Sequence, residues 1–169
     1  MKRRNWIVGL VVVGAIGWYL FRPELLFVRT QVNESLPATT SAETVGRTGA
    51  EAAIPASLLA GRFHSVAHET NGNATVHELP DGKRVLRLTE FTTSNGPDVR
   101  VYLVAATDAS DNETVKKAGF VELGKLKGTE GEQNYDVPGD LDLGKYRAVT
   151  IWCRRFSVLR GRLSATRSP

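Results

Sequence analysis

The chain has 169 residues, one cysteine and a formal net charge of +4. This length suits one domain with a single core, and one cysteine excludes an internal disulfide. Residues 55–152 carry 11 basic and 14 acidic side chains, and five arginines follow them. Because aromatic and basic side chains do not interleave as in single-strand binders, the sequence argues against a nucleic-acid partner.

An apolar segment lies at the N-terminus. Residues 6–21 carry no charge, follow the basic residues 2–4, and have Trp6 and Trp18 near their ends. At about 1.5 Å rise per residue, this run reaches the short end of the range for transmembrane helices, and aromatic rings favour the membrane interface. The sequence predicts a single-pass anchor over residues 1–27. The N-terminus would be cytoplasmic and the rest of the chain periplasmic or extracellular. A cleaved signal peptide and a buried core helix are the alternatives.

A polar stretch separates this anchor from the rest of the chain. Residues 28–54 are rich in Thr, Ser, Ala, Glu and Gly and contain few large apolar side chains. Such a composition buries too little surface to offset the entropy of ordering, so we predict a flexible linker. An irregular first layer of the folded domain is the alternative. Residues 55–169 then form the folded domain.

The folded part has the pattern of an all-β protein. Short apolar stretches at 85–91, 99–105, 120–126 and 147–156 alternate with turn signals, a spacing typical of a β-sandwich or barrel. The alternation in 99–105 predicts a half-buried strand. Residues 112–117 are the one expected helical turn. We therefore predict a single all-β domain, a sandwich or a barrel, behind the N-terminal helix.

Three histidines raise the question of a metal or haem site. Asn71-Gly72 is the preferred pair for a type I′ hairpin turn, and a hairpin turning there places His64, His68 and His77 on one face. His64 and His68 would be about 13 Å apart, too far to share an ion. His68 and His77 would be diagonal neighbours that could just converge. Exposed histidines on a polar face are the favoured interpretation, so no metal site is predicted.

Cys153 is the candidate for redox chemistry. In the predicted strand it shares a face with Val149, Ile151 and Arg155. The two apolar neighbours point to burial, whereas Arg155, about 6.6 Å further along the face, would favour a thiolate. A buried structural cysteine and a reactive thiol both remain open. The sequence contains no Cys-x-x-Cys and no hydrolase or phosphate-binding motif.

Several motifs in order resemble the DM13 domain family, over residues 58–165 or nearly the whole folded part. They are 95–103 (NGPDVRVYL), 123–128 (LGKLKG), 131–138 (GEQNYDVP) and 143–158 (LGKYRAVTIWCRRFSV). The resemblance implies an electron-transfer module of the cell surface. One position departs from the family: Arg160 stands where a large apolar residue is usual before the glycine that matches Gly161.

The resemblance also implies roles for residues. Cys153 would be the redox thiol or the ligand of a prosthetic group, and Trp152, Arg154 and Arg155 would shape its environment. The cofactor is left open: a haem or other redox group is compatible with the sequence, which requires none. A redox partner protein is implied, and whether the domain is an enzyme stays undecided. The alternative is a non-enzymatic envelope β-sandwich that binds a ligand or protein, with Cys153 structural.

Overall fold

The computed structural model describes residues 2–21, 28–37 and 55–167. Helix α1 (Lys2–Phe21) forms over the apolar segment, and its side chains from Trp6 to Tyr19 are exposed. Taking length and hydropathy together, no helix within the described ranges qualifies as a membrane span. The predicted transmembrane helix is therefore not supported by the described residues.

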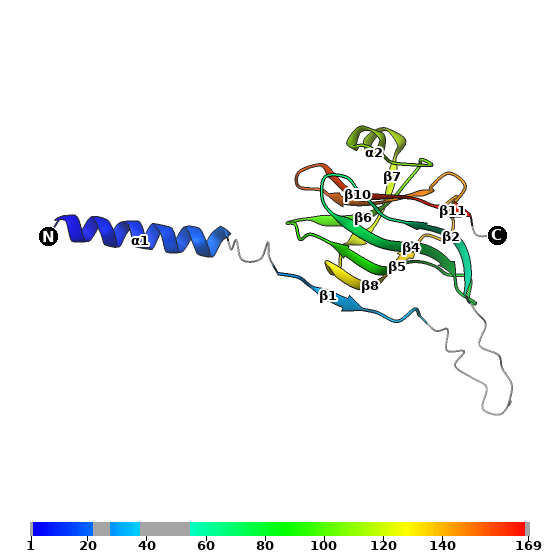
Figure 1. Cartoon of the computed structure of the whole chain (residues 1–169), viewed down its shortest axis with the longest axis horizontal. Helices are drawn as coiled ribbons and strands as arrows, with labels where there is room; N and C mark the ends of the chain where they lie inside the picture. Colours follow the sequence, from blue (N-terminus) through cyan, green and yellow to red (C-terminus); the bar gives the residue numbers. More distant parts are fainter. Residues whose placement is uncertain (1, 22–27, 38–54, 168–169) are drawn as a thin grey trace, which may run out of the picture.

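The domain consists of two β-sheets, so the all-β prediction is confirmed (Figure 1). The first sheet has six strands, in the order β1 (Gln31–Asn33), β8 (Glu130–Val137), β5 (Arg84–Thr93), β4 (Thr70–Glu78), β2 (Ala56–Arg62) and β11 (Thr166–Arg167). The second has five, in the order β3 (His64–Ser65), β10 (Val158–Ser164), β9 (Ala148–Cys153), β6 (Val99–Val104) and β7 (Phe120–Lys125). The four predicted strands correspond to β5, β6, β7 and β9.

The main hydrophobic core lies between the two sheets. Leu86 and Leu88 of β5 pack there against Val101 of β6 and Ile151 of β9, and all four side chains are fully buried. Leu86 and Leu88 are two apart in β5, as expected when alternate side chains point to one face of a sheet. The architecture is therefore a β-sandwich.

A second hydrophobic cluster covers the outer face of the five-stranded sheet. Helix α2 (Asn112–Ala118) begins at Asp111, whose carboxylate accepts a hydrogen bond from the Thr114 N–H at 2.7 Å. Val115 of α2 packs in a cluster with Tyr102 and Trp152. The predicted helical turn is confirmed. The half-buried character predicted for 99–105 is wrong, because α2 buries the outer face of β6 as well.

The Asn71-Gly72 pair does not form the predicted hairpin turn. Both residues lie inside β4, which passes through a β-bulge there and pairs with β2 on one side and β5 on the other. Gly72 has a φ of 111°, and a Cβ at this position would lie 2.7 Å from the Cα of Phe91. Gly72 therefore allows β4 and β5 to approach closely at the bulge, a position that suits glycine as well as a hairpin turn does.

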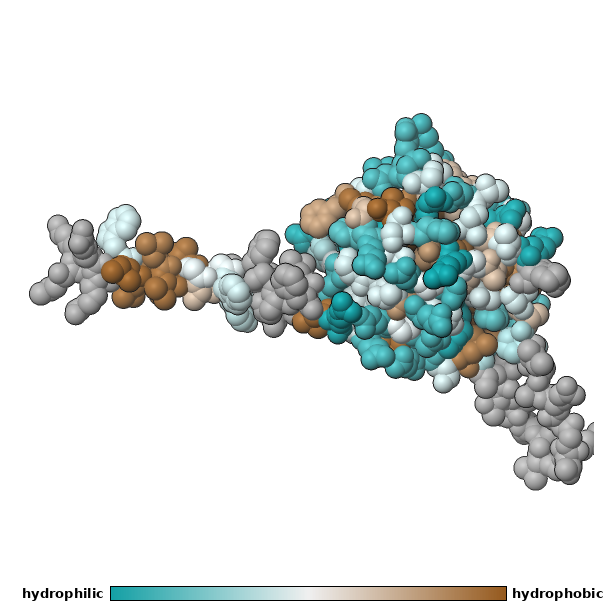
Figure 2. Space-filling view, viewed as in Figure 1, coloured by the Kyte–Doolittle hydropathy of each residue, from teal (hydrophilic) through white to brown (hydrophobic). Residues whose placement is uncertain are grey.

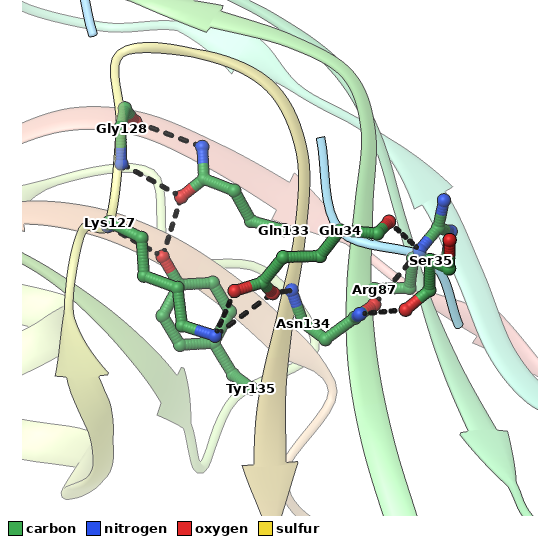
Figure 3. A network of polar contacts seen from close by, with 8 residues as sticks. All are labelled: Glu34, Ser35, Arg87, Lys127, Gly128, Gln133, Asn134 and Tyr135. Atoms are coloured by element: carbon green, nitrogen blue, oxygen red, sulfur yellow. Dashed lines mark hydrogen bonds and ion pairs between the residues drawn. The ribbon is translucent and has the colours of Figure 1, made fainter. Parts of the chain in front are cut away.

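The start of the predicted linker belongs to the sandwich. Strand β1 adds to β8 in parallel, with Val32 opposite Gly131. Glu34 then accepts hydrogen bonds from the Lys127 ammonium at 2.8 Å and the Asn134 N–H at 2.7 Å (Figure 3). Partial burial raises the pKa of Glu34, but these two hydrogen bonds and the positive charges of Lys127 and Arg87 together hold the pKa below its usual value. Residues 38–54 of the predicted linker lie outside the described residues.

A buried polar network joins β8 to the loop that precedes it. The Tyr135 hydroxyl donates to Gln133 Oε1 at 2.7 Å and accepts from the Lys127 N–H at 3.1 Å (Figure 3). The Gln133 amide also donates to the Gly128 carbonyl at 2.9 Å. Burial raises the pKa of Tyr135 to about 12. The network therefore requires a protonated phenol.

Tyr135→Phe should flatten the loss of stability at alkaline pH. Between pH 10 and about 12 the unfolded wild-type chain loses the Tyr135 proton while the folded chain keeps it, so the free energy of unfolding falls as pH rises. A shift of this size corresponds to about 2–3 kcal/mol across the window. Urea unfolding at stepped pH measures the slope, with Tyr146→Phe as the control. Parallel slopes in wild type and Tyr135→Phe would contradict the assignment.

Candidate functional site

Cys153 is the last residue of β9 and is buried at one end of the β-sandwich. It stands opposite Val99 of β6 and Val158 of β10, and only 1% of its surface is exposed. Trp152, the preceding residue, belongs to the outer cluster with Tyr102, with ring centroids 6.5 Å apart. The predicted alternation of Cys153 and Trp152 is therefore present, and burial of the thiol is nearly complete.

The arginines that follow Cys153 do not continue the strand. Residues 154–157 form the turn between β9 and β10, and Arg154, Arg155 and Phe156 are exposed. The Arg154 N–H donates to the Asp98 carbonyl at 2.9 Å. The prediction that Arg155 shares the strand face of Cys153 is wrong, because the strand ends one residue after Trp152 and the chain reverses.

A different arginine supplies the cation beside the cysteine. Arg160 lies in a β-bulge of β10, between Leu159 and Gly161, and is only 3% exposed. Burial lowers the pKa of its guanidinium, and interaction with Cys153 opposes that change. Its Nε has no hydrogen-bond partner among the described residues. The interaction with Cys153 consists of a charge contribution and a side-chain hydrogen bond.

The other contacts of Arg160 are with neutral groups of the loop after β5. Its Nη2 donates to the Ser94 carbonyl at 2.9 Å, to the Ser94 hydroxyl and to the Asn95 carbonyl at 3.0 Å. No carboxylate of the described residues forms an ion pair with it. At Gly96 a Cβ would lie 2.8 Å from Arg160 Nη1. Glycine at this position lets the loop close over the guanidinium.

Two loops flank this site. On one side the N–H groups of Val66 and His68 donate to the Arg160 carbonyl, at 2.9 and 3.4 Å. On the other, a pocket of about 160 Å³ lies between residues 95–99, residues 125–129 and Thr30. Because Cys153 is only 1% exposed, a reagent can reach it only if surrounding residues are displaced.

The three histidines do not share a face. His64 lies in β3 opposite Arg162, and His77 lies in β4 of the other sheet. His68 is in the loop between β3 and β4, with its Nδ1 3.4 Å from the Ser94 hydroxyl. Burial lowers the pKa of both His68 and His77, and the positive charge of Arg160 contributes at His68. The predicted common face is wrong because β4 continues through Asn71-Gly72.

These positions do not fit a haem or a metal ion. His68 contacts Ser94, which accepts from Arg160, and His77 belongs to the opposite sheet. The pocket of about 160 Å³ that Val99 helps to line does not include Cys153 and is smaller than the roughly 300–1,000 Å³ of ligand sites. Within the described residues, no group of three or more His, Cys, Asp and Glu could hold a metal ion.

Comparison with known proteins gives one family. The sequence model of a family described as "Electron transfer DM13" matches residues 62–163, more than half of the chain. The matched region contains both Cys153 and Arg160. Neither a curated protein nor a solved structure matches the chain.

Gly161→Ala should destabilise the domain through the bulge that holds Arg160. A Cβ on Gly161 would lie 2.5 Å from the Cβ of Thr70, which is fully buried. Overpacking of this kind costs about 1–3 kcal/mol. Urea unfolding measures the loss, and Gly139→Ala is the control because nothing lies within 4 Å of its Cβ. Equal stability of the two variants would mean that the bulge relaxes freely.

Proposed function

The chain belongs to the electron transfer DM13 family, and we propose that Cys153 is its redox-active group, with Arg160 as the residue that positions and stabilises the thiolate. The observation that supports this most is the buried guanidinium beside the one cysteine of the chain. The family supports a redox role for the domain. The interaction between Arg160 and Cys153 supports the placement of that role at Cys153.

Charge balance is the argument for the proposed role of Arg160. Apart from Cys153, the Arg160 guanidinium donates to two carbonyls and one hydroxyl, all neutral. A buried cation without a counter-charge is costly, whereas a negative sulfur beside it lowers that cost. Cations next to a cysteine stabilise the thiolate, which is the nucleophilic form. Arg160 therefore acts through Cys153 rather than on a partner directly.

The chemistry we propose is thiol–disulfide exchange with a partner protein. The Cys153 thiolate attacks one sulfur of a partner disulfide, a new S–S bond forms, and the partner's own S–S bond breaks. The second partner sulfur leaves as a thiolate. Cys153 is thereby oxidised and the leaving sulfur is reduced, so electrons balance within the two proteins. Because Cys153 is buried, the reaction follows a local opening of the loops that flank it.

We also propose that α1 attaches the domain to the cell envelope membrane. Its apolar side chains are exposed in the free chain, including Trp6 at 78% and Leu10 at 68%. Lipid removes such apolar surface from water. The basic residues at its start favour a cytoplasmic N-terminus, with the DM13 domain on the periplasmic or extracellular side. A redox partner would then be found in the same compartment.

The near-complete burial of Cys153 supports a second candidate, an envelope β-sandwich that binds a ligand or protein. In that function Cys153 is a small core residue, and Arg160 is held by its loop contacts alone. Cys153→Ala would then cost about 1–2 kcal/mol of stability and change nothing else. The two candidates differ in whether the native thiol reacts.

Arg160→Met should slow the reaction of native Cys153 with methyl methanethiosulfonate. The small reagent forms a mixed disulfide and releases methanesulfinate, so mass spectrometry of quenched samples gives the rate. Loss of the buried cation should lower the rate at pH 7 roughly tenfold, equivalent to about 1.4 kcal/mol. Arg162→Met is the matched control, because Arg162 of the same strand pairs with Asp108 instead.

The same measurement separates the two candidates. A wild-type thiol that reacts only in urea, with no difference in Arg160→Met, supports the structural cysteine. Faster reaction in Arg160→Met could arise from loosened packing, so hydrogen exchange of β9 and β10 is followed in each variant. A faster reaction without increased exchange overturns the stabilising role of Arg160.

A further inference from the structure

We infer that the end of the sandwich that carries Cys153 binds an anionic lipid surface through the turn at residues 154–157. This inference rests on the proposed membrane attachment by α1 and adds an orientation of the domain to it. The turn lies at one tip of the sandwich, together with the loop after β5 (Figure 1).

The connection to α1 reaches the domain at this same tip. The Val28 carbonyl accepts a hydrogen bond from the Asn95 side chain at 3.3 Å, and the Asn95 carbonyl accepts from Arg160 at 3.0 Å. Six residues separate Phe21 from Val28. They span at most about 25 Å even when fully extended. A helix held in a membrane therefore keeps the tip with Arg160 close to the lipid surface.

The turn has the side chains that bind such a surface. Arg154 and Arg155 are exposed, and Phe156 between the two strands is 65% exposed. The two nearby carboxylates, Asp98 and Glu122, are both paired with Arg100, and Glu122 Oε2 also lies 4.0 Å from Arg154 Nη1. The Arg154 side chain is 61% exposed in spite of this pair, and Arg155 forms no ion pair within the described residues. Both can reach lipid phosphates, and Phe156 suits the interface between headgroups and acyl chains.

The opposite tip carries charges of both signs. The connection between β8 and β9 is exposed at Asp140 and Asp142 and also at Lys145. In Figure 2 hydrophobic surface appears at the tip where Figure 1 places the β9–β10 turn, beside otherwise hydrophilic surface. An anionic membrane attracts the turn with Arg154 and Arg155 more strongly than a tip of mixed charge, so one orientation is favoured.

Docking of this turn on a membrane also determines where Cys153 lies. Val158, the first residue of β10 after the turn, stands directly opposite Cys153. Docking of the turn on lipid brings Cys153 and its flanking loops to the membrane surface. The class of partner that this arrangement fits is one held in the same membrane.

The experiment uses the full chain with Cys153→Ala and Phe156→Cys, labelled with the environment-sensitive dye NBD. The chain is reconstituted into phosphatidylcholine vesicles, with or without phosphatidylglycerol. We expect at least a twofold higher dye emission in the anionic vesicles, reversed by high salt because surface charges are screened. Gly139→Cys in the same background labels the opposite tip and should show no difference.

A second variant keeps the result interpretable. Arg154→Glu with Arg155→Glu should abolish the rise while vesicle flotation stays unchanged. Failure to float overturns both the attachment by α1 and this inference. Flotation with equal emission in neutral and anionic vesicles overturns the orientation alone. Neither outcome bears on the thiol chemistry, because the labelled chain lacks Cys153.

Discussion

The burial of β9 on both faces is the constraint on which the rest of the domain depends. Val149 and Ile151 pack in the core between the sheets, while Ala148 and Trp152 pack in the cluster under α2. Every residue of the strand is buried. Such a strand has little freedom to move, so Cys153 at its end is held by a rigid element. Mobility near the thiol must therefore come from the loops that flank it.

The bulge in β10 explains how a charged residue enters this apolar frame. Leu159 belongs to the cluster on the outer face of the five-stranded sheet. In a regular strand one side chain would then point to the main core before the next side chain points to the outer face. The bulge inserts an extra residue, so Arg160 and Gly161 together occupy that interval. Gly161 leaves room for Thr70, and Arg160 extends toward the loop after β5. A charge buried at such cost is more easily explained by function than by stability.

Local patterns predicted what depends on neighbours in sequence. Alternating apolar residues predicted the strands β5, β6, β7 and β9, and residues 112–117 were correctly expected to form a helical turn, which is α2. Partners distant in sequence decided the rest. Asn71-Gly72 has the same composition whether it forms a turn or a bulge, and only the pairing of β4 with two strands distinguishes them. The cation beside Cys153 was expected two residues along the strand, whereas a hairpin brings it from β10.

In the proposed function the buried thiol has to react, and movement of the flanking loops would reconcile its burial with that reactivity. The strand contributes position, Arg160 contributes charge, and both flanking loops are held to Arg160 by a few hydrogen bonds to its carbonyl and guanidinium. Opening either loop exposes the guanidinium to water, which weakens its interaction with the thiolate. A partner that opens the site must therefore replace water with its own surface. A partner that contacts the tip of the sandwich would reach Cys153 and at the same time exclude water from the proposed pair of Cys153 and Arg160.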